Sequence, residues 1–304
     1  MINPSSLLTS EEIVKLKKPK DWLNYFTVFS IWFQIACSVF LYALYPYWYV
    51  FLISALLIGT RQFALVILMH DGAHNLINRN SRINDFISQW LCAFPMMTDT
   101  FAYRIYHLQH HKHTETSKDP DKSLTDPFPA TKWSFLRKIT RDVTGIAGLR
   151  RYLGYFISAW GKDEKTFFQH LRHFIIKLKG FFISQIIIFS FFLLADIPLL
   201  YFLLWWVPKL TVFSLFYRLR NIAEHACTSG KSDFSNTRTT LSPWIIRFFI
   251  APLNVNFHLE HHLFMFCPWY NLPLAHRILK TKSFYKDLEI DKGYLNVFSK
   301  VIAN

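Results

Sequence analysis

The chain has 304 residues, of which 52% are hydrophobic and 18% aromatic, and its formal net charge at pH 7 is +14. This apolar content exceeds that of an ordinary soluble domain and is typical of a protein that lies partly in a membrane. The basic residues flank the apolar runs, which indicates loops facing anionic lipid or an acidic partner protein and excludes nucleic acid as the expected partner. The four cysteines form no CxxC pair, and we expect them to be reduced packing residues.

The first part of the chain contains two apolar runs that are long enough to cross a bilayer. Residues 1–22 are polar and basic with a modest apolar side, so we expect an interfacial or capping segment and no secretory signal. The spans follow at about 25–44 and 50–69, and the aromatic stretch 45–49 separates them at a membrane surface. Arg61 lies inside the second run, where a charge is usually functional or buried against protein.

Two further spans are expected at about 181–196 and 199–217. Before them, the apolar patches 83–97 and 167–176 are too short or too interrupted to cross a bilayer, and we expect these to be helices that lie in the interface. Lys209 follows a proline within the fourth run, which predicts either a kinked span or a span placed deeper.

The charges of the loops predict the orientation of the spans. The turns at 45–49 and 195–198 contain no lysine or arginine, whereas the other loops contain many. The positive-inside rule therefore places both termini and all the histidine motifs on the cytoplasmic side.

Nine of the 13 histidines occur at spacings that place side chains on one face of a helix. Three motifs and one further histidine make up the nine: His70 and His74; His107, His110 and His111; His258, His261 and His262; and His225. Each adjoins the end of a span or an interfacial helix, so all can converge on one site just below the bilayer. Neutral imidazole is the commonest metal ligand, and nine exceed the four ligands of a tetrahedral zinc site. Two metals of higher coordination fit the number better, and a nitrogen-rich shell without thiolates suits iron.

Other polar residues near the motifs could support the metals. Asn221 lies four residues before His225, so it could hold a water on one metal while His225 ligates the same metal. Five carboxylates are candidates to orient the imidazoles through their second ring nitrogen: Asp71, Asp119, Asp121, Glu224 and Glu260.

Several neighbouring residues have simpler interpretations. Four histidines lie outside the motifs and are expected to be ordinary surface or core residues: His113, His170, His173 and His276. Arg218 and Arg220 could contact a substrate head group or anchor the chain at the interface. Trp269 and Tyr270 favour an aromatic belt over a tunnel wall, and residues 119–121 could form a simple turn.

The motifs resemble those of the membrane fatty acid desaturase superfamily. Its three histidine boxes match His70-x-x-x-His74, His107-x-x-His110-His111 and His258-x-x-His261-His262. The surrounding residues resemble the bacterial branch, notably in Arg218-x-Arg220-x-x-Ala223-Glu224-His225 and Asn256-Phe257-His258-Leu259-Glu260-His261-His262-Leu263-Phe264. The resemblance extends from about Arg61 to His276.

The resemblance implies an all-α integral membrane protein with four transmembrane helices and a cytosolic helical cap that holds a di-iron site. Residues 1–304 would form one domain, with the cap contributed by 70–180 and 218–304. Two iron ions would be the cofactor and O2 a co-substrate. Similar enzymes share the box histidines between two irons and complete one site with an Asn-x-x-x-His element, which Asn221 and His225 match.

The activity implied is an oxygen-dependent desaturase that introduces a C=C bond into an acyl chain with two electrons from an external donor. The substrate would be a fatty acyl lipid, an acyl-CoA or an acyl-carrier protein, and the donor a ferredoxin or a cytochrome b5-type protein. No His-Pro-Gly-Gly stretch of a fused cytochrome b5 domain occurs, so we expect a separate, acidic donor at the basic face. The expected location is a bacterial inner membrane, with the active site cytoplasmic.

Two kinds of alternative remain open. A hydroxylase, ketolase or acetylenase of a lipid, alkane or carotenoid would use the same boxes, because small differences in substrate placement decide which product forms. A histidine-rich metal transporter is an alternative of a different class, although transport sites usually lie near mid-bilayer on broken helices and these histidines lie beyond the span ends.

Overall fold

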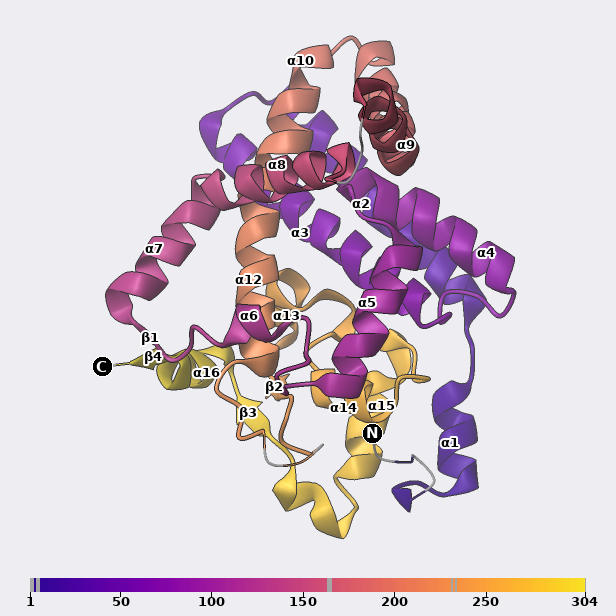
Figure 1. Cartoon of the computed structure of the whole chain (residues 1–304), viewed down its shortest axis with the longest axis vertical. Coiled ribbons are helices and arrows are strands. Elements are labelled where there is room, and N and C mark those ends of the chain that lie inside the picture. The colour runs from indigo at the N-terminus through magenta and orange to yellow at the C-terminus, as the bar shows by residue number, and fades with distance from the viewer. Residues whose placement is uncertain (1–2, 4–5, 163–165, 231, 233, 304) are drawn as a thin grey trace.

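The computed structural model describes residues 3, 6–162, 166–230, 232 and 234–303. These residues are predominantly helical, and four helical segments are long and apolar enough to cross a membrane: Ser10–Leu44, Trp48–Ala73, Phe167–Leu194 and Pro198–His225. The turn into α10 lies at one end of the long axis of the molecule, and α14, α15 and the N-terminal segment lie toward the other end (Figure 1). The predicted all-α membrane fold with four spans is thus confirmed.

The first two spans agree closely with the sequence prediction. The first segment comprises two helices, α1 (Ser10–Lys17) and α2 (Asp21–Leu44), and the second is α3 (Trp48–Ala73). The last turns of α3 continue beyond the predicted end at residue 69 because they are buried against protein. Gly72 permits this packing, since a Cβ there would lie 2.2 Å from the hydroxyl oxygen of Ser88.

The third span differs from the prediction. Residues 167–176 do not form a separate interfacial helix, because α9 runs without a break from Phe167 to Leu194. Lys177 and Lys179 interrupt the apolar pattern but not the helix, since lysine is a good helix former and both side chains are exposed. A helix of 28 residues is about 42 Å long and exceeds a hydrocarbon layer of about 30 Å, so its first turns can extend out of the membrane.

The fourth span is broken, as one of the two interpretations of Lys209 predicts. Four consecutive helical pieces form it: α10 (Pro198–Leu200), the π-helix η4 (Tyr201–Trp206), α11 (Val207–Leu210) and α12 (Val212–His225). The break falls at Thr211, whose backbone is non-helical (φ −103°, ψ −80°), just after Pro208 and the π-helix. The Lys209 ammonium is fully buried and donates a hydrogen bond of 2.9 Å to the carbonyl oxygen of Pro95. Four aromatic rings surround it at 4.4 to 5.7 Å: Tyr152, Phe181, Trp205 and Trp206.

The segment between the second and third spans forms one part of the cap that carries histidines. Its elements are α4 (Ser81–Phe86), the π-helix η2 (Ile87–Ala93), η3 (Phe94–Met96), α5 (Thr100–His113), α6 (Lys122–Thr125), β1 (Ala130–Thr131), α7 (Lys132–Val143) and α8 (Ile146–Trp160). The predicted patch at 83–97 is therefore helical, but it is built from three short helical pieces.

The segment after the fourth span forms the rest of the cap. Its elements are β2 (Thr239–Leu241), α13 (Trp244–Ile250), η5 (Pro252–Asn254), α14 (His258–Leu263), η6 (Trp269–Asn271), α15 (Leu272–Leu279), η7 (Ser283–Asp287), β3 (Ile290–Lys292), α16 (Tyr294–Val301) and β4 (Ile302–Ala303). The strands form two small parallel pairs, β1 with β4 and β2 with β3, and tie distant parts of the cap together.

The N-terminal helix packs on this second part of the cap, in agreement with the predicted capping segment. Thr9 and Glu12 form a capping box that begins α1. Leu8 and Leu16 are buried in one apolar cluster with residues of α14 and α15, and Asn271 donates to the carbonyl oxygen of Leu16 at 2.9 Å. Residues 1–2 and 4–5 of the same predicted segment lie outside the described residues.

Candidate metal centre

The structure brings all nine motif histidines together from four helices: α3, α5, α12 and α14. They form two groups, within each of which the ligand nitrogens lie within 4.8 Å of one another. The first group contains five imidazoles: His70, His74, His107, His111 and His261. The second group contains four: His110, His225, His258 and His262. Segments separated by up to about 190 residues in sequence thus meet at the ends of the second and fourth spans.

Two helices supply both groups at once. In α5, His107 and His111 belong to the first group, whereas His110 belongs to the second. In α14, His258 and His262 belong to the second group and the intervening His261 to the first. Residues four apart share a helix face, while adjacent residues point about 100° apart, so each neighbouring pair of histidines divides between the groups.

The spacing of the ring nitrogens within each group fits a metal ion. His111 Nε2 lies 3.0 Å from His107 Nε2 and 3.0 Å from His261 Nε2. His258 Nε2 lies 2.9 Å from His225 Nε2 and 3.1 Å from His262 Nε2. Two nitrogens that bind one metal at a right angle, with bonds of about 2.1 Å, would be about 3.0 Å apart.

Two further nitrogens of the first group support the same conclusion. Nε2 of His70 and Nε2 of His74 are buried without a hydrogen-bond partner among the described residues. A buried polar atom without a partner is costly, and a metal ion would remove that cost. Each of the two groups therefore fits one metal ion.

The protonation states of the imidazoles favour metal binding. Burial lowers the pKa of His107, His111 and His261 well below the usual value, and the neighbouring imidazoles lower it further. The same causes, burial first, lower the pKa of His258 and His262. These side chains are accordingly neutral at pH 7, with a lone pair available for a metal.

His74, which directly follows α3, also belongs to the first group. Its pKa falls to about 4, mainly because of burial and to a smaller extent because of the nearby Arg104. His74 is therefore also a neutral imidazole at pH 7.

Polar side chains hold the second nitrogen of several imidazoles. His110 Nδ1 lies 2.8 Å from an Asp119 carboxylate oxygen, and His70 Nδ1 lies 3.4 Å from Asp71, as the sequence predicts for these two carboxylates. Asp121 lies 3.6 Å from the same nitrogen of His110. Although burial alone would raise the pKa of Asp119, its hydrogen bond with His110 lowers that pKa below the usual range. The turn at 119–121 thus positions an imidazole.

Glu260 and Glu224 differ from the prediction. Glu260 does not hold a motif imidazole, because its carboxylate accepts hydrogen bonds from His276, at 2.6 Å, and from Thr239. It connects α14 to α15 and β2, and it gives the buried His276 a partner away from both groups. Glu224 accepts from Arg220, and its other oxygen lies 3.5 Å from His258 Nε2, the nitrogen that faces the group.

Some residues that support the site carry no recognisable signal in the sequence. Tyr103 lies 3.4 Å from His107 Nδ1, and Thr114 lies 3.3 Å from His262 Nδ1. Arg220 contacts Asn221 at 3.3 Å and His258 Nδ1 at 3.4 Å in addition to Glu224. Arg220 belongs to the stretch Arg218-x-Arg220-x-x-Ala223-Glu224-His225, but the sequence suggests a head-group contact or an interfacial anchor for it and not this role.

The other residues with alternative interpretations have partners inside the protein. Arg218 pairs with Asp142 of α7. Trp269 is not a free aromatic belt residue, since its indole N–H donates to Asn24 at 2.9 Å and its backbone N–H donates to Asp71 at 3.0 Å. The hydroxyl oxygen of Tyr270 accepts from the backbone of Lys20. The four cysteines are free, and none belongs to either histidine group.

Asn221 lies beside the second group. It lines a small cavity of about 20 Å³ together with His110, His225 and His258. A cavity needs about 10 to 15 Å³ to hold one water molecule, and this one is polar, so it is large enough for a single water between the amide and the imidazoles.

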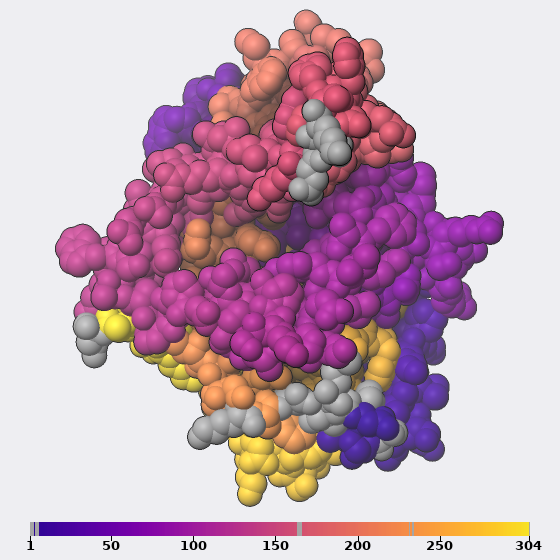
Figure 2. All heavy atoms as spheres, in the orientation of Figure 1, coloured from indigo at the N-terminus to yellow at the C-terminus, as the bar shows by residue number. Residues whose placement is uncertain are grey.

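A much larger cavity, of about 730 Å³, reaches the site from the side. His70 and Asn221 line it, as do the apolar residues Phe63, Val66 and Phe213. Figure 2 shows a hollow between α8 and the α5–α6 segment, with α12 at its floor, and all four elements contribute residues to the cavity. A molecule in this cavity can reach the histidines while most of its surface is shielded from water.

Comparison with known proteins agrees with this architecture. Residues 46–292 match the family model described as fatty acid desaturase. The chain is 27% identical over 241 residues to dihydrorhizobitoxine desaturase of Bradyrhizobium elkanii, an alignment that covers 76% of this chain and 68% of the relative. It is 26% identical to zeaxanthin 4-ketolase of Chlamydomonas reinhardtii, over 71% of this chain and 42% of the relative. It is 24% identical to beta-carotene 4-ketolase of Protosiphon botryoides, over 70% and 48%. The alignments thus span less than half the length of either ketolase.

The fold and the site define a helical protein with four candidate membrane spans and two adjoining histidine groups that could each hold a metal ion. Because the family model matches most of its length, the chain belongs to the fatty acid desaturase family. This membership does not support the metal-transporter alternative, whereas desaturation, hydroxylation and ketone formation all remain compatible with it.

Proposed function

We propose that the nine histidines bind two iron ions. His70, His74, His107, His111 and His261 would hold the first ion, and His110, His225, His258 and His262 the second, with Asn221 adding a ligand through a water. The donor set supports iron, since it is rich in nitrogen and contains no thiolate. The 20 Å³ cavity beside Asn221 supports the water.

On this basis we propose that the protein is an O2-dependent fatty acyl desaturase. The observation that carries this function is the 730 Å³ cavity that is lined by His70 of the first group and by aliphatic and aromatic side chains. The cavity can hold a flexible acyl chain with its CH2 groups next to the metal centre. Iron, when bound, would supply the activation of O2 and the removal of hydrogen from carbon.

The overall reaction balances with an external reductant. The acyl chain loses two hydrogen atoms, which carry away two electrons, and a C=C bond forms from the two electrons that remain. The donor supplies two further electrons, and O2 is reduced to two waters with two protons from solvent. The basic surface implied by a net charge of +14 favours an acidic donor, a ferredoxin or a cytochrome b5-type protein.

The residues of the chain would bind, orient and exclude water. The apolar wall would align the substrate and keep water from the reacting carbon. Asp119 and Asp71 would keep His110 and His70 in the ring orientation that ligation needs. Arg220 would hold Asn221 and His258 in place through its contacts with both.

The proposed substrate is a fatty acyl lipid, an acyl-CoA or an acyl-carrier protein. The proposed location is a bacterial inner membrane. Both termini and the histidines would be cytoplasmic, because the two turns expected on the opposite side lack lysine and arginine. An acyl carrier or lipid head group would then remain at the cytoplasmic surface while the chain enters the cavity.

A ketolase or hydroxylase is the second candidate, because two of the relatives are carotenoid 4-ketolases. The same centre and cavity serve either outcome, and small changes in substrate position select between removing a second hydrogen and inserting oxygen.

Expression in a bacterial host with a ferredoxin and its reductase tests the proposal. Mass spectrometry of host lipids is expected to show acyl chains that have lost two hydrogens with the wild type and not with His261→Ala. Products that have gained oxygen would establish the second candidate instead. Unchanged lipids and carotenoids, from protein that contains two irons per chain, would refute both.

A further inference from the structure

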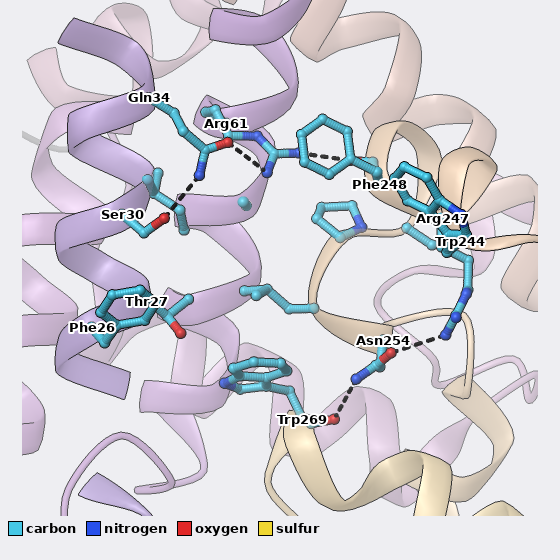
Figure 3. Close-up of a pocket in the computed structure, with 15 residues that line it drawn as sticks. Phe26, Thr27, Ser30, Gln34, Arg61, Trp244, Arg247, Phe248, Asn254 and Trp269 are labelled. Atoms are coloured by element: carbon cyan, nitrogen blue, oxygen red, sulfur yellow. Dashed lines mark hydrogen bonds between the residues drawn. The ribbon is translucent and has the colours of Figure 1, made fainter. Parts of the chain in front are cut away.

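A second cavity, of about 320 Å³, lies away from the histidines, between the first two spans and the segment α13–η5. Figure 3 shows side chains of α2 and α3 on one side of it, and side chains of α13, η5 and Trp269 on the other. The lining residues are Phe26, Thr27, Ser30, Ile31, Gln34, Arg61, Ala64, Trp244, Arg247, Phe248, Ala251, Pro252, Leu253, Asn254 and Trp269. Its wall is apolar except for a few amides and hydroxyls and two arginines.

Arg61 is the buried charge that the sequence leaves unexplained. The residue is 6% exposed, and one of its terminal nitrogens donates to the carbonyl oxygen of Phe248 at 2.6 Å. Its other terminal nitrogen reaches Gln34 at only 3.5 Å, and the guanidinium stacks on the Phe248 ring at 4.0 Å. The Nε–H is buried and has no hydrogen-bond partner among the described residues.

Arg247, on the opposite wall, likewise has a buried Nε–H without a hydrogen-bond partner among the described residues. One of its terminal nitrogens donates to Asn254 at 3.1 Å. Both arginines line the cavity, Arg61 from α3 and Arg247 from α13.

The charge of this cavity is not balanced by the protein. Its lining contains no aspartate or glutamate, and within the described part of the chain neither arginine has an ion pair. Other buried arginines are paired, Arg220 with Glu224 and Arg238 with Asp291. Lys209, the other cation inside a span, has a carbonyl partner and four aromatic rings and lines none of the cavities. Arg61 is a buried charge within a span and Arg247 adds a second positive charge from the cap, so an anionic ligand would balance charges that the protein leaves unpaired.

The surroundings identify the ligand as a lipid. The cavity lies along the first half of α2 and beside Arg61 of α3, within the two spans. Two of its lining residues, Phe26 and Trp244, are exposed apolar side chains, at 60% and 70% exposure, as expected of a cavity that opens toward lipid. An amphiphile with an anionic head group satisfies both the arginines and these apolar side chains.

We propose that the cavity binds the phosphate group of an anionic phospholipid, with Arg61 and Arg247 donating to its oxygens and the acyl chains lying along α2. A phosphodiester has two non-bridging oxygens, one for each arginine, and guanidinium is well suited to phosphate. The site is separate from the histidine centre, so it goes beyond the proposed oxidation and holds whether or not that reaction is a desaturation.

Lipid binding by the full-length protein in detergent tests this site. Native mass spectrometry with added phosphatidylglycerol, phosphatidylcholine, oleate or inorganic phosphate measures which molecule remains bound. The wild type is expected to retain one phosphatidylglycerol per chain and to bind it at least about tenfold more tightly than phosphatidylcholine. Arg247→Gln and Arg61→Gln are each expected to weaken this binding about tenfold or more.

Arg82→Gln is the matched control, because Arg82 is an exposed arginine that does not line the cavity, and its binding is expected to equal that of the wild type. Ser30→Trp, which fills the cavity without changing charge, is expected to abolish retention. If the buried Arg61→Gln fails to fold, Arg247→Gln and Ser30→Trp decide, with thermal unfolding in detergent alone as the check on folding. Equal binding of phosphatidylcholine, tighter binding of oleate or free phosphate, or an equal loss in Arg82→Gln would each overturn the proposal.

Discussion

The two cavities of this protein differ in how their charges are balanced. The larger one is lined by charges of both signs, Asp99 and Asp121 as well as Arg151, Lys177 and Arg220, and by the imidazole of His70. The smaller one is lined by two arginines and no carboxylate. The larger cavity thus offers carboxylates that can pair with its cations, whereas the positive charge of the smaller cavity would be balanced by its ligand. Changes at the two sites should therefore have separate effects.

The largest expected effect is that of His111→Ala on the larger cavity. His111 Nε2 lies 3.0 Å from two other imidazoles of the first group, so its loss should remove one ligand and disturb two more. We expect oxidation of the substrate to fall below detection and iron to fall below two per chain, as measured by product analysis and elemental analysis. Phosphatidylglycerol retention should not change.

His113→Ala is the control for this substitution, because His113 lies on the same helix but in neither group. An active His111→Ala protein with two irons would contradict the proposed ligand set.

Val66→Trp tests whether the substrate occupies the larger cavity, without changing a proposed metal ligand. Val66 lines the larger cavity, so an indole there would occupy space that the substrate needs. We expect activity to fall about tenfold or more, since misplacing a substrate by about 1 Å can cost about a hundredfold, while iron content stays the same. Leu52→Trp, on the exposed face of the same helix, is the matched control. Full activity in Val66→Trp would mean that the substrate binds elsewhere.

Asn221→Ala is expected to have a smaller effect. The side chain borders the water-sized cavity of the second group, and outer-shell partners of metal ligands typically contribute about 10- to 100-fold to metal affinity or activity. Iron affinity should weaken for one ion and not for the other, which titration of metal-free protein can resolve. Asn296→Ala changes an exposed asparagine that does not line this cavity and should have no effect. Uniform weakening of both ions would argue against a role confined to the second group.

The smallest effect concerns pH in the metal-free protein. Burial lowers the pKa of His74 to about 4, and it also lowers the pKa of His107 and His261 well below the usual value, whereas in an unfolded chain these groups titrate near 6.5. Below pH 6.5 the unfolded chain therefore binds more protons than the folded one, and the free energy of unfolding should decrease as pH falls from about 6.5 to about 4.

Thermal unfolding of the metal-free protein across this range checks the pH prediction. Lipid retention should not change over the same interval, because arginine stays protonated. A free energy of unfolding that is constant from pH 6.5 to pH 4 would contradict the buried, neutral state of the imidazoles.

Local spacing was sufficient to predict what a single helix determines. The intervals within His107 to His111 and within His258 to His262 predict shared helix faces, and these side chains do meet. The apolar runs likewise predict four spans, and all four are present. The division into groups of five and four was not predictable, because it depends on how α3, α5, α12 and α14 cross. Their ligation stays a prediction.

The helix ends and the partner of Glu260 differ from the sequence prediction because they depend on contacts between distant parts of the chain. Apolar composition does not show where a helix ends when its last residues are buried against protein and not in lipid. For this reason α3 and α12 extend past the predicted limits. Lys177 and Lys179 end the apolar patch 167–176 in the sequence, but they do not end α9, because their side chains are exposed and do not disturb the helical backbone. Glu260, a candidate to orient a motif imidazole, instead holds His276, which lies beyond the motifs in sequence but next to Glu260 in space.

The division of neighbouring histidines between the two groups links the fates of the two ions. His110 and His111, like His261 and His262, are consecutive residues that belong to different groups. Any shift or rotation of α5 or α14 that opens one group must open the other, so a change that moves either helix is expected to weaken the binding of both ions. Neither group can therefore be remodelled in evolution by moving these two helices without consequences for its neighbour.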